Sequence, residues 1–192
     1  MCDYDLAESP VPRRAPIGRT QPIESQVKVM ESVSQWMSEL ADRDPYVRDF
    51  ARAHLVEHKG AEVTRELVAA LLDPRVYLRW EAAKALQEIA DPIAAPALMH
   101  ALEDENEDVR WVAGEALIAL GKVGQLTVLS GLTRRAGSLD FCKAAHHVLH
   151  GSQADMPELA PVRAALEHLD RAIIAPVAAF QALAILSHST GA

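Results

Sequence analysis

The sequence contains an internal repeat with a period of 31 residues. In each of three gap-free copies an aspartate opens the segment, an arginine follows six residues later, and a leucine closes it. A fourth copy aligns after a one-residue insertion, with Cys142 in place of the arginine, and a fainter fifth copy aligns Ala179 with Ala145. Because a unit of this length cannot bury an apolar face alone, the period predicts units stacked side by side in an elongated solenoid. The three gap-free copies are Asp42 to Leu55, Asp73 to Leu86 and Asp104 to Leu117.

Each unit is predicted to be a pair of antiparallel helices. Apolar residues recur every three or four positions from Ile23 to about residue 188, which is typical of amphipathic helices. The chain has 33 alanines and 22 leucines but only 9 aromatic residues, a composition that favours closely packed helices over strands. Asp44-Pro45 and Asp73-Pro74 each suggest an N-cap followed by proline at the first helical position. We therefore expect an all-α fold. The first helices of five pairs are predicted at about 24–40, 61–72, 93–103, 123–134 and 157–169, and the second helices at about 45–57, 75–89, 107–120, 140–150 and 174–188.

The repeated pattern resembles HEAT-like repeats, in the short-period subgroup named after phycobilisome lyases. The resemblance is carried by the Asp-x5-Arg spacing, with small residues and a leucine after it, in residues 73–86 and 104–117, and it extends over residues 24–188. It implies a right-handed α-α superhelix, or solenoid, of about five HEAT-like helical pairs. It also implies a ladder in which turn aspartates and helix arginines of neighbouring units pair and which ends after three units; an anion site made by the arginines is the alternative. The ladder residues would be Asp42, Arg48, Asp73, Arg79, Asp104 and Arg110.

Composition limits the domain organisation and the classes of partner. Residues 1–22 contain four prolines, so we expect a flexible N-terminal tail before a HEAT-like repeat domain over residues 23–192. The net charge of −8, without a dense basic stretch, argues against a nucleic-acid partner. The sequence also lacks a signal pattern and a long apolar run, which argues against a membrane protein. With only Cys2 and Cys142 as thiols, a reducing compartment fits best, so we expect a cytoplasmic protein. Nothing in the sequence indicates an oligomer, and a monomer is the default expectation.

Two tryptophans, Trp80 and Trp111, occupy equivalent positions one repeat apart. They fall near the start of second helices, which in HEAT-like solenoids line the concave surface. Lys84 and Glu115 follow one helical turn later, so the four residues would form an aromatic strip with charged edges, a composition typical of protein-binding sites. The other interpretation is that the two indoles pack between adjacent units.

Histidines gather at His146, His147 and His150. A spacing of four residues places two imidazoles on one face of a helix, which makes the cluster a candidate metal site. No acidic residue at a comparable spacing completes a ligand set, and surface or capping histidines are the simpler interpretation. Cys142 falls near the start of the same predicted helix, where the helix dipole can lower the pKa of a thiol.

The sequence favours a binding protein over an enzyme. HEAT-like deoxyhypusine hydroxylases carry a His-Glu pair directly after the repeat arginine to hold iron, whereas no histidine stands at these positions here. We therefore expect no catalytic residue, no cofactor and no enzymatic activity. The leading hypothesis is a non-enzymatic scaffold or adaptor that binds a protein partner through its concave face. The alternatives are a lyase- or chaperone-like protein acting on a bilin-carrying or other cofactor protein, and a metal-binding protein that uses the histidine cluster.

Overall fold

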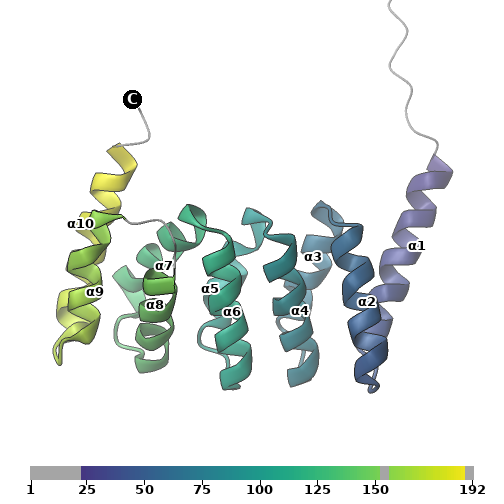
Figure 1. Cartoon of the computed structure of the whole chain (residues 1–192), viewed down its shortest axis with the longest axis horizontal. Helices are drawn as coiled ribbons and strands as arrows, with labels where there is room; N and C mark the ends of the chain where they lie inside the picture. Colours follow the sequence, from purple (N-terminus) through teal and green to yellow (C-terminus); the bar gives the residue numbers. More distant parts are fainter. Residues whose placement is uncertain (1–22, 152–155, 189–192) are drawn as a thin grey trace, which may run out of the picture.

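The computed structural model describes residues 23–151 and 156–188, which form helices joined by short turns. The expected flexible tail of residues 1–22 and the last four residues of the expected repeat domain, 189–192, lie outside the described residues. Figure 1 shows the helices standing side by side along the long axis of the molecule. The helices are α1 (Ile23–Leu40), α2 (Pro45–Glu57), α3 (Ala61–Ala70), α4 (Val76–Ile89), α5 (Ala95–Ala101), α6 (Glu107–Ala119), α7 (Lys122–Arg135), α8 (Leu139–Gly151), α9 (Ala160–Glu167) and α10 (Arg171–His188), and short 3-10 turns at Pro92–Ala94 and Pro157–Leu159 precede α5 and α9.

Over the described residues, this architecture confirms the predicted all-α solenoid of five helical pairs. The bounds also follow local signals in the sequence. Asp44 is the N-cap of α2, where its carboxylate accepts a hydrogen bond from the backbone N–H of Tyr46, and Pro45 is the first helical residue. The same prediction for Asp73-Pro74 is wrong, because α4 starts only at Val76. The Asp73 carboxylate instead accepts hydrogen bonds from the backbone and the side chain of Arg75, which tightens the turn ahead of the helix.

The first four pairs form two layers. The second helices α2, α4, α6 and α8 pack against one another in order, and the first helices α5 and α7 do the same. Small side chains permit the close approach of α4 and α6, since Ala82, Ala85, Ala113 and Ala116 are almost fully buried. Each inner repeat therefore buries its apolar surface against its two neighbours, as the 31-residue period predicted.

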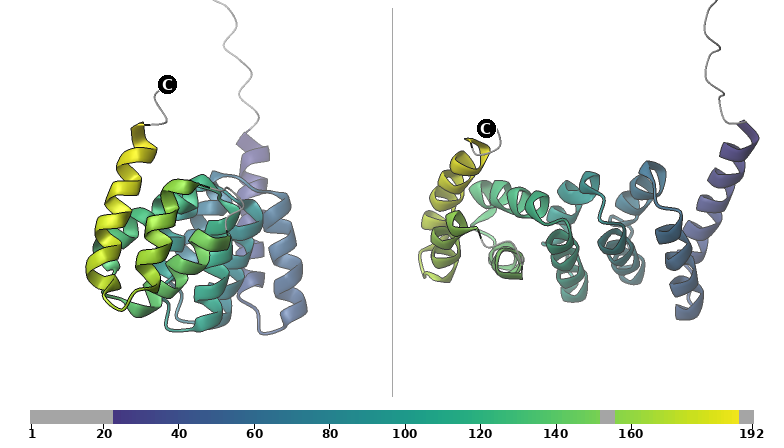
Figure 2. Two further views of the ribbon diagram at one scale, coloured as in Figure 1. Left: turned by 60° about the vertical axis from the view of Figure 1, so that its left-hand side comes forward. Right: turned by 45° about the horizontal axis from the view of Figure 1, so that its top comes forward.

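The fifth pair is inverted relative to the other four. α10 packs mainly against α7 and α9, while α9 contacts α8. In the right-hand view of Figure 2, α10 (yellow) lies in the row of α7, and α9 lies in the row of α8. The predicted equivalence of Ala179 in α10 with Ala145 in α8 is therefore wrong. Both alanines are fully buried, but they belong to opposite layers, because the same small-residue spacing serves helix packing in either layer.

The repeated arginine caps the turn of its own unit. Arg79 donates hydrogen bonds to the backbone carbonyls of Asp73 and Pro74. The equivalent arginines do the same one repeat before and after: Arg48 donates to the carbonyls of Asp42 and Arg43, and Arg110 donates to those of Asp104 and Glu105. The Asp-x5-Arg spacing thus reflects a contact within each of these three units, which satisfies carbonyls at the turn between its two helices.

Between units, the pairing differs from the expected ladder. Arg79 forms a bidentate ion pair with Asp104 of the next unit, at 2.7 and 2.9 Å, and this carboxylate raises the pKa of the arginine. Arg48 binds Glu81 of α4 at 3.1 Å. Asp73 is held by Arg75, whose guanidinium lowers the pKa of that carboxyl to about 2. The predicted ladder would pair Arg48 with Asp73. In the structure Arg48 pairs with Glu81 instead, because Asp73 is already bound by Arg75.

Among the described residues, no helix combines the length and the apolar character that crossing a bilayer requires.

Candidate protein-binding face

The outward surface of the second helices carries a row of hollows. We call it the second-helix face; it presents Arg48, Trp80, Trp111 and His147 from α2, α4, α6 and α8 in turn. Three hollows of about 440, 370 and 300 Å³ lie along it. Trp80 lines the first and second of these, and Trp111 lines the second and third. The two tryptophans therefore form the walls between successive hollows.

The middle hollow brings together the four residues that the sequence singles out as a binding strip. Trp80, Lys84, Trp111 and Glu115 all line it, so the helical spacing placed them on one surface. The two indoles differ in their surroundings. Trp80 is half-buried and packs against the core, whereas Trp111 is 58% exposed. Packing between units accounts for Trp80, and a large exposed indole remains at Trp111.

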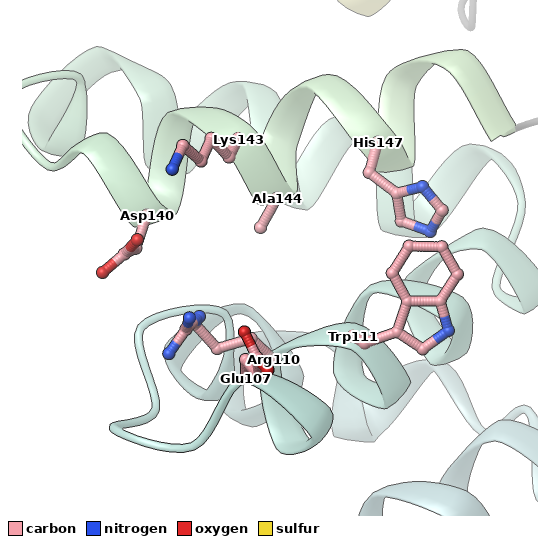
Figure 3. A pocket seen from close by; sticks show the side chains of 7 residues that line it. All are labelled: Glu107, Arg110, Trp111, Asp140, Lys143, Ala144 and His147. Atoms are coloured by element: carbon pink, nitrogen blue, oxygen red, sulfur yellow. The ribbon is translucent and has the colours of Figure 1, made fainter.

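His147 holds Trp111 in place. The two rings stack with centroids 4.2 Å apart and 29° between their planes, and the Nε2 atom of His147 lies 2.7 Å from the Glu115 carboxylate. Figure 3 shows the imidazole of α8 facing the indole of α6. The spacing of the histidines makes His147 a metal candidate, but its contacts belong to the second-helix face. The one-residue insertion in the fourth copy makes His147 equivalent to Glu115, and this register was the signal that could have identified it.

Charged side chains surround the exposed indole. In the third hollow, Asp140 and Lys143 from α8 lie across from Glu107 and Arg110 of α6, as Figure 3 shows. Both charge signs therefore occur within one hollow, next to an aromatic wall. This combination suits a partner segment that inserts an apolar group and surrounds it with polar or charged groups.

At the other end of the face, a buried acid ties α2 to α4. Glu81 is 5% exposed and accepts hydrogen bonds from Arg48 and Arg52, each at 3.1 Å. Arg52 is further paired with Asp49 and Glu88. Sequence reasoning missed Glu81, because its partners lie about 30 residues away on the neighbouring helix. Such a network fixes the relative position of the two helices.

The remaining two histidines of the cluster lie elsewhere. His146 and His150 have ring centroids 4.2 Å apart, and the Nε2 atom of His146 is 3.4 Å from the Glu167 carboxylate at the end of α9. Partial loss of hydration and the neighbouring imidazole of His146 lower the pKa of His150. The three histidines therefore do not form one ligand set, and α9 supplies the acid that the local sequence lacked.

Cys142 is buried rather than reactive. It is 2% exposed, and its thiol donates a hydrogen bond to the carbonyl of Ala136 at 3.2 Å. Burial raises the pKa of this thiol, although Arg171 opposes the effect. The expected lowering by the helix dipole is thus wrong, because burial outweighs it.

Comparison with known proteins identifies the repeat. Residues 33–118 match the sequence family of HEAT repeats, so this part of the chain is built of HEAT repeats, and stacked helical pairs continue after it. Comparison with curated proteins gives no match. Among solved structures, the chain is similar to the complex of CpcE and CpcF of phycocyanin lyase from Nostoc sp. PCC7120. That likeness has a TM-score of 0.46 and 21% sequence identity, and it covers 91% of this chain and 70% of the other.

Proposed function

We propose that this protein is a non-enzymatic adaptor that binds a segment of a partner protein on its second-helix face. The observation that carries the proposal is the 58% exposed indole of Trp111, which His147 holds between two hollows. A large aromatic side chain that is already fixed by a stacking contact loses little conformational entropy when a partner covers it. Exposed, preorganised aromatic residues of this kind are frequent hot spots of protein interfaces.

The surroundings of Trp111 support a protein partner. Lys84 and Asp108 line the hollow on one side, and Asp140 and Lys143 line the hollow on the other. Mixed charges around an aromatic centre match the polar rim of protein interfaces, which excludes water from the anchor and selects the partner by charge pattern. The stacked helices supply a rigid base, because each of α4 and α6 is packed on both sides.

The test compares partner capture by the wild type and by variants of the tagged full-length chain. The variant Trp80→Ala plus Trp111→Ala removes both aromatic walls. Leu72→Ala is the control, because Leu72 is 83% exposed but lies in the turn after α3, outside the second-helix face. Bound proteins are identified by mass spectrometry, and the affinity of each one is then measured with purified components.

We expect a partner that the wild type and the Leu72→Ala control retain alike and that the double tryptophan variant binds at least about 30-fold more weakly, as for loss of an interface hot spot. Circular dichroism checks that all three chains are equally helical. Equal binding by the double variant would disprove the proposal. Stoichiometric binding of a bilin by the purified wild type would instead favour the lyase-like alternative.

A further inference from the structure

Three potential metal ligands converge where α8 meets the inverted fifth pair. His146 and His150 come from α8, and Glu167 is the last residue of α9. Each offers one ligand atom, and these three atoms all lie within 4.8 Å of one another. The Nε2 atom of His146 and the nearer oxygen of Glu167 are 3.4 Å apart. Two ligands of a tetrahedral zinc ion, each about 2.0 Å from the metal, lie about 3.3 Å apart, so this pair already has the separation of such ligands.

The backbone places these groups without distorting the helices. His146 and His150 are one helical turn apart, which brings their rings together on one face of α8. His147, between them in the sequence, is directed to Glu115 of α6. The carboxylate comes from a separate helix, so the ligand set depends on the packing of α9 against α8 rather than on a single turn of sequence.

We propose that His146, His150 and Glu167 bind a divalent first-row transition-metal ion, with Zn²⁺ as the best fit. Two imidazoles and one carboxylate are a ligand set that zinc accepts, and such three-ligand sites take water or another ligand as the fourth. A hollow of about 340 Å³ adjoins His146 and Glu167 and leaves room on that side for the fourth ligand. The bound ion would link α8 to α9 across the boundary between the regular repeats and the inverted pair.

A second histidine cluster, at the end of α2, is the other candidate metal site among the described residues. His54, Glu57 and His58 also lie close together, but they come from a single turn at the end of one helix. Nδ1 of His58 lies 3.0 Å from the carbonyl oxygen of His54, and the ring of His54 stacks on Trp36 at 5.2 Å with 7° between the planes. The Nδ1 atom of His58 is thus engaged by the backbone, and all three groups come from one helix end, so this cluster serves as the control.

The test measures Zn²⁺ binding by isothermal titration calorimetry on the metal-free full-length chain, produced without a polyhistidine tag. We expect one Zn²⁺ per chain. His150→Ala should weaken binding by about 100-fold or more and Glu167→Gln by about 10-fold or more, since each removes one coordinating group. His147→Ala is the neighbouring control, and the double variant His54→Ala plus His58→Ala removes the competing cluster; both should bind as the wild type does.

A second readout uses Co²⁺ in place of Zn²⁺, because its visible absorption reports on the coordinating groups. We expect the cobalt spectrum of the wild type to change in Glu167→Gln and to stay the same in His147→Ala. Circular dichroism verifies that each variant is folded, and the solvent-facing position of Glu167 keeps this variant informative if a histidine variant loses structure. Failure of the wild type to bind Zn²⁺ stoichiometrically, unchanged affinity in His150→Ala and Glu167→Gln, or binding that depends on His54 and His58 would each overturn the proposal.

Discussion

At the scale of single residues, the repeat arginine illustrates how one side chain can serve two purposes. Arg79 donates to two carbonyls of its own turn and forms a bidentate ion pair with Asp104 of the next unit. Both side chains of the pair are more than nine-tenths buried. Removing one partner from a buried pair leaves the other charge unpaired, which costs more than the pair itself contributes.

We therefore predict that Arg79→Ala lowers the free energy of unfolding by about 2 to 3 kcal/mol, since it leaves the Asp104 carboxylate without its counter-ion and two turn carbonyls without their side-chain donor. Urea denaturation followed by circular dichroism measures this change. Arg75→Ala is the control, because its partner is the more exposed Asp73, and it should cost clearly less. Equal losses in the two variants would contradict a special role for the buried pair.

At the scale of elements, close approach between helices depends on particular glycines. A Cβ atom added at Gly124 in α7 would lie 1.9 Å from the carbonyl oxygen of Leu117 in α6. Because this neighbour is backbone, a rotamer change cannot relieve the clash, and α6 and α7 would have to separate. At Gly137, in the turn after α7, an added Cβ meets no atom within 4 Å.

Gly124→Ala should accordingly destabilise the protein by about 2 kcal/mol or more, as overpacking against an unyielding neighbour does. The matched change Gly137→Ala should alter stability by less than about 1 kcal/mol, and it can stabilise by restricting the unfolded chain. Thermal unfolding of both variants and the wild type measures these changes in stability. A Gly124→Ala protein as stable as the wild type would show that the α6–α7 junction can widen freely.

At the scale of the whole molecule, stability is set by contacts between neighbouring units. α4 and α6 lie inside the stack and share extensive contacts, whereas α9 has only eight residues and lies at the inverted end. In a linear array of this kind, units open from the ends more readily than from the middle.

Amide hydrogen exchange should therefore be slowest in α4 and α6 and markedly faster in α9, because opening of the fifth pair leaves the central packing intact. Exchange monitored by mass spectrometry on peptides from these three helices measures the difference. Saturating Zn²⁺ should slow exchange in α8 and α9 only if the proposed metal site forms. Uniform exchange along the chain would indicate that the array unfolds as one unit.

Spacing along the chain is enough to predict the helical repeat, the limits of most helices and the surface that carries Trp80 and Trp111. These features depend on how residues are spaced within about 30 positions of one another. Apolar periodicity, prolines and capping residues show that spacing directly in the sequence. The alignment of the fourth repeat copy also makes His147 equivalent to Glu115, so it could have placed His147 on this surface.

The side chains that meet across helices are set by how the helices pack, and the sequence pattern does not predict them. Arg48 binds Glu81, His147 stacks on Trp111, and Glu167 approaches His146 because α2 and α4, α6 and α8, and α8 and α9 lie side by side. The inversion of the fifth pair likewise has no local signature, since buried alanines at helical spacing fit either layer. The physical reason is that helix formation depends on residues close together in the sequence. The contacts between side chains of different helices depend on which helix surfaces pack together in space.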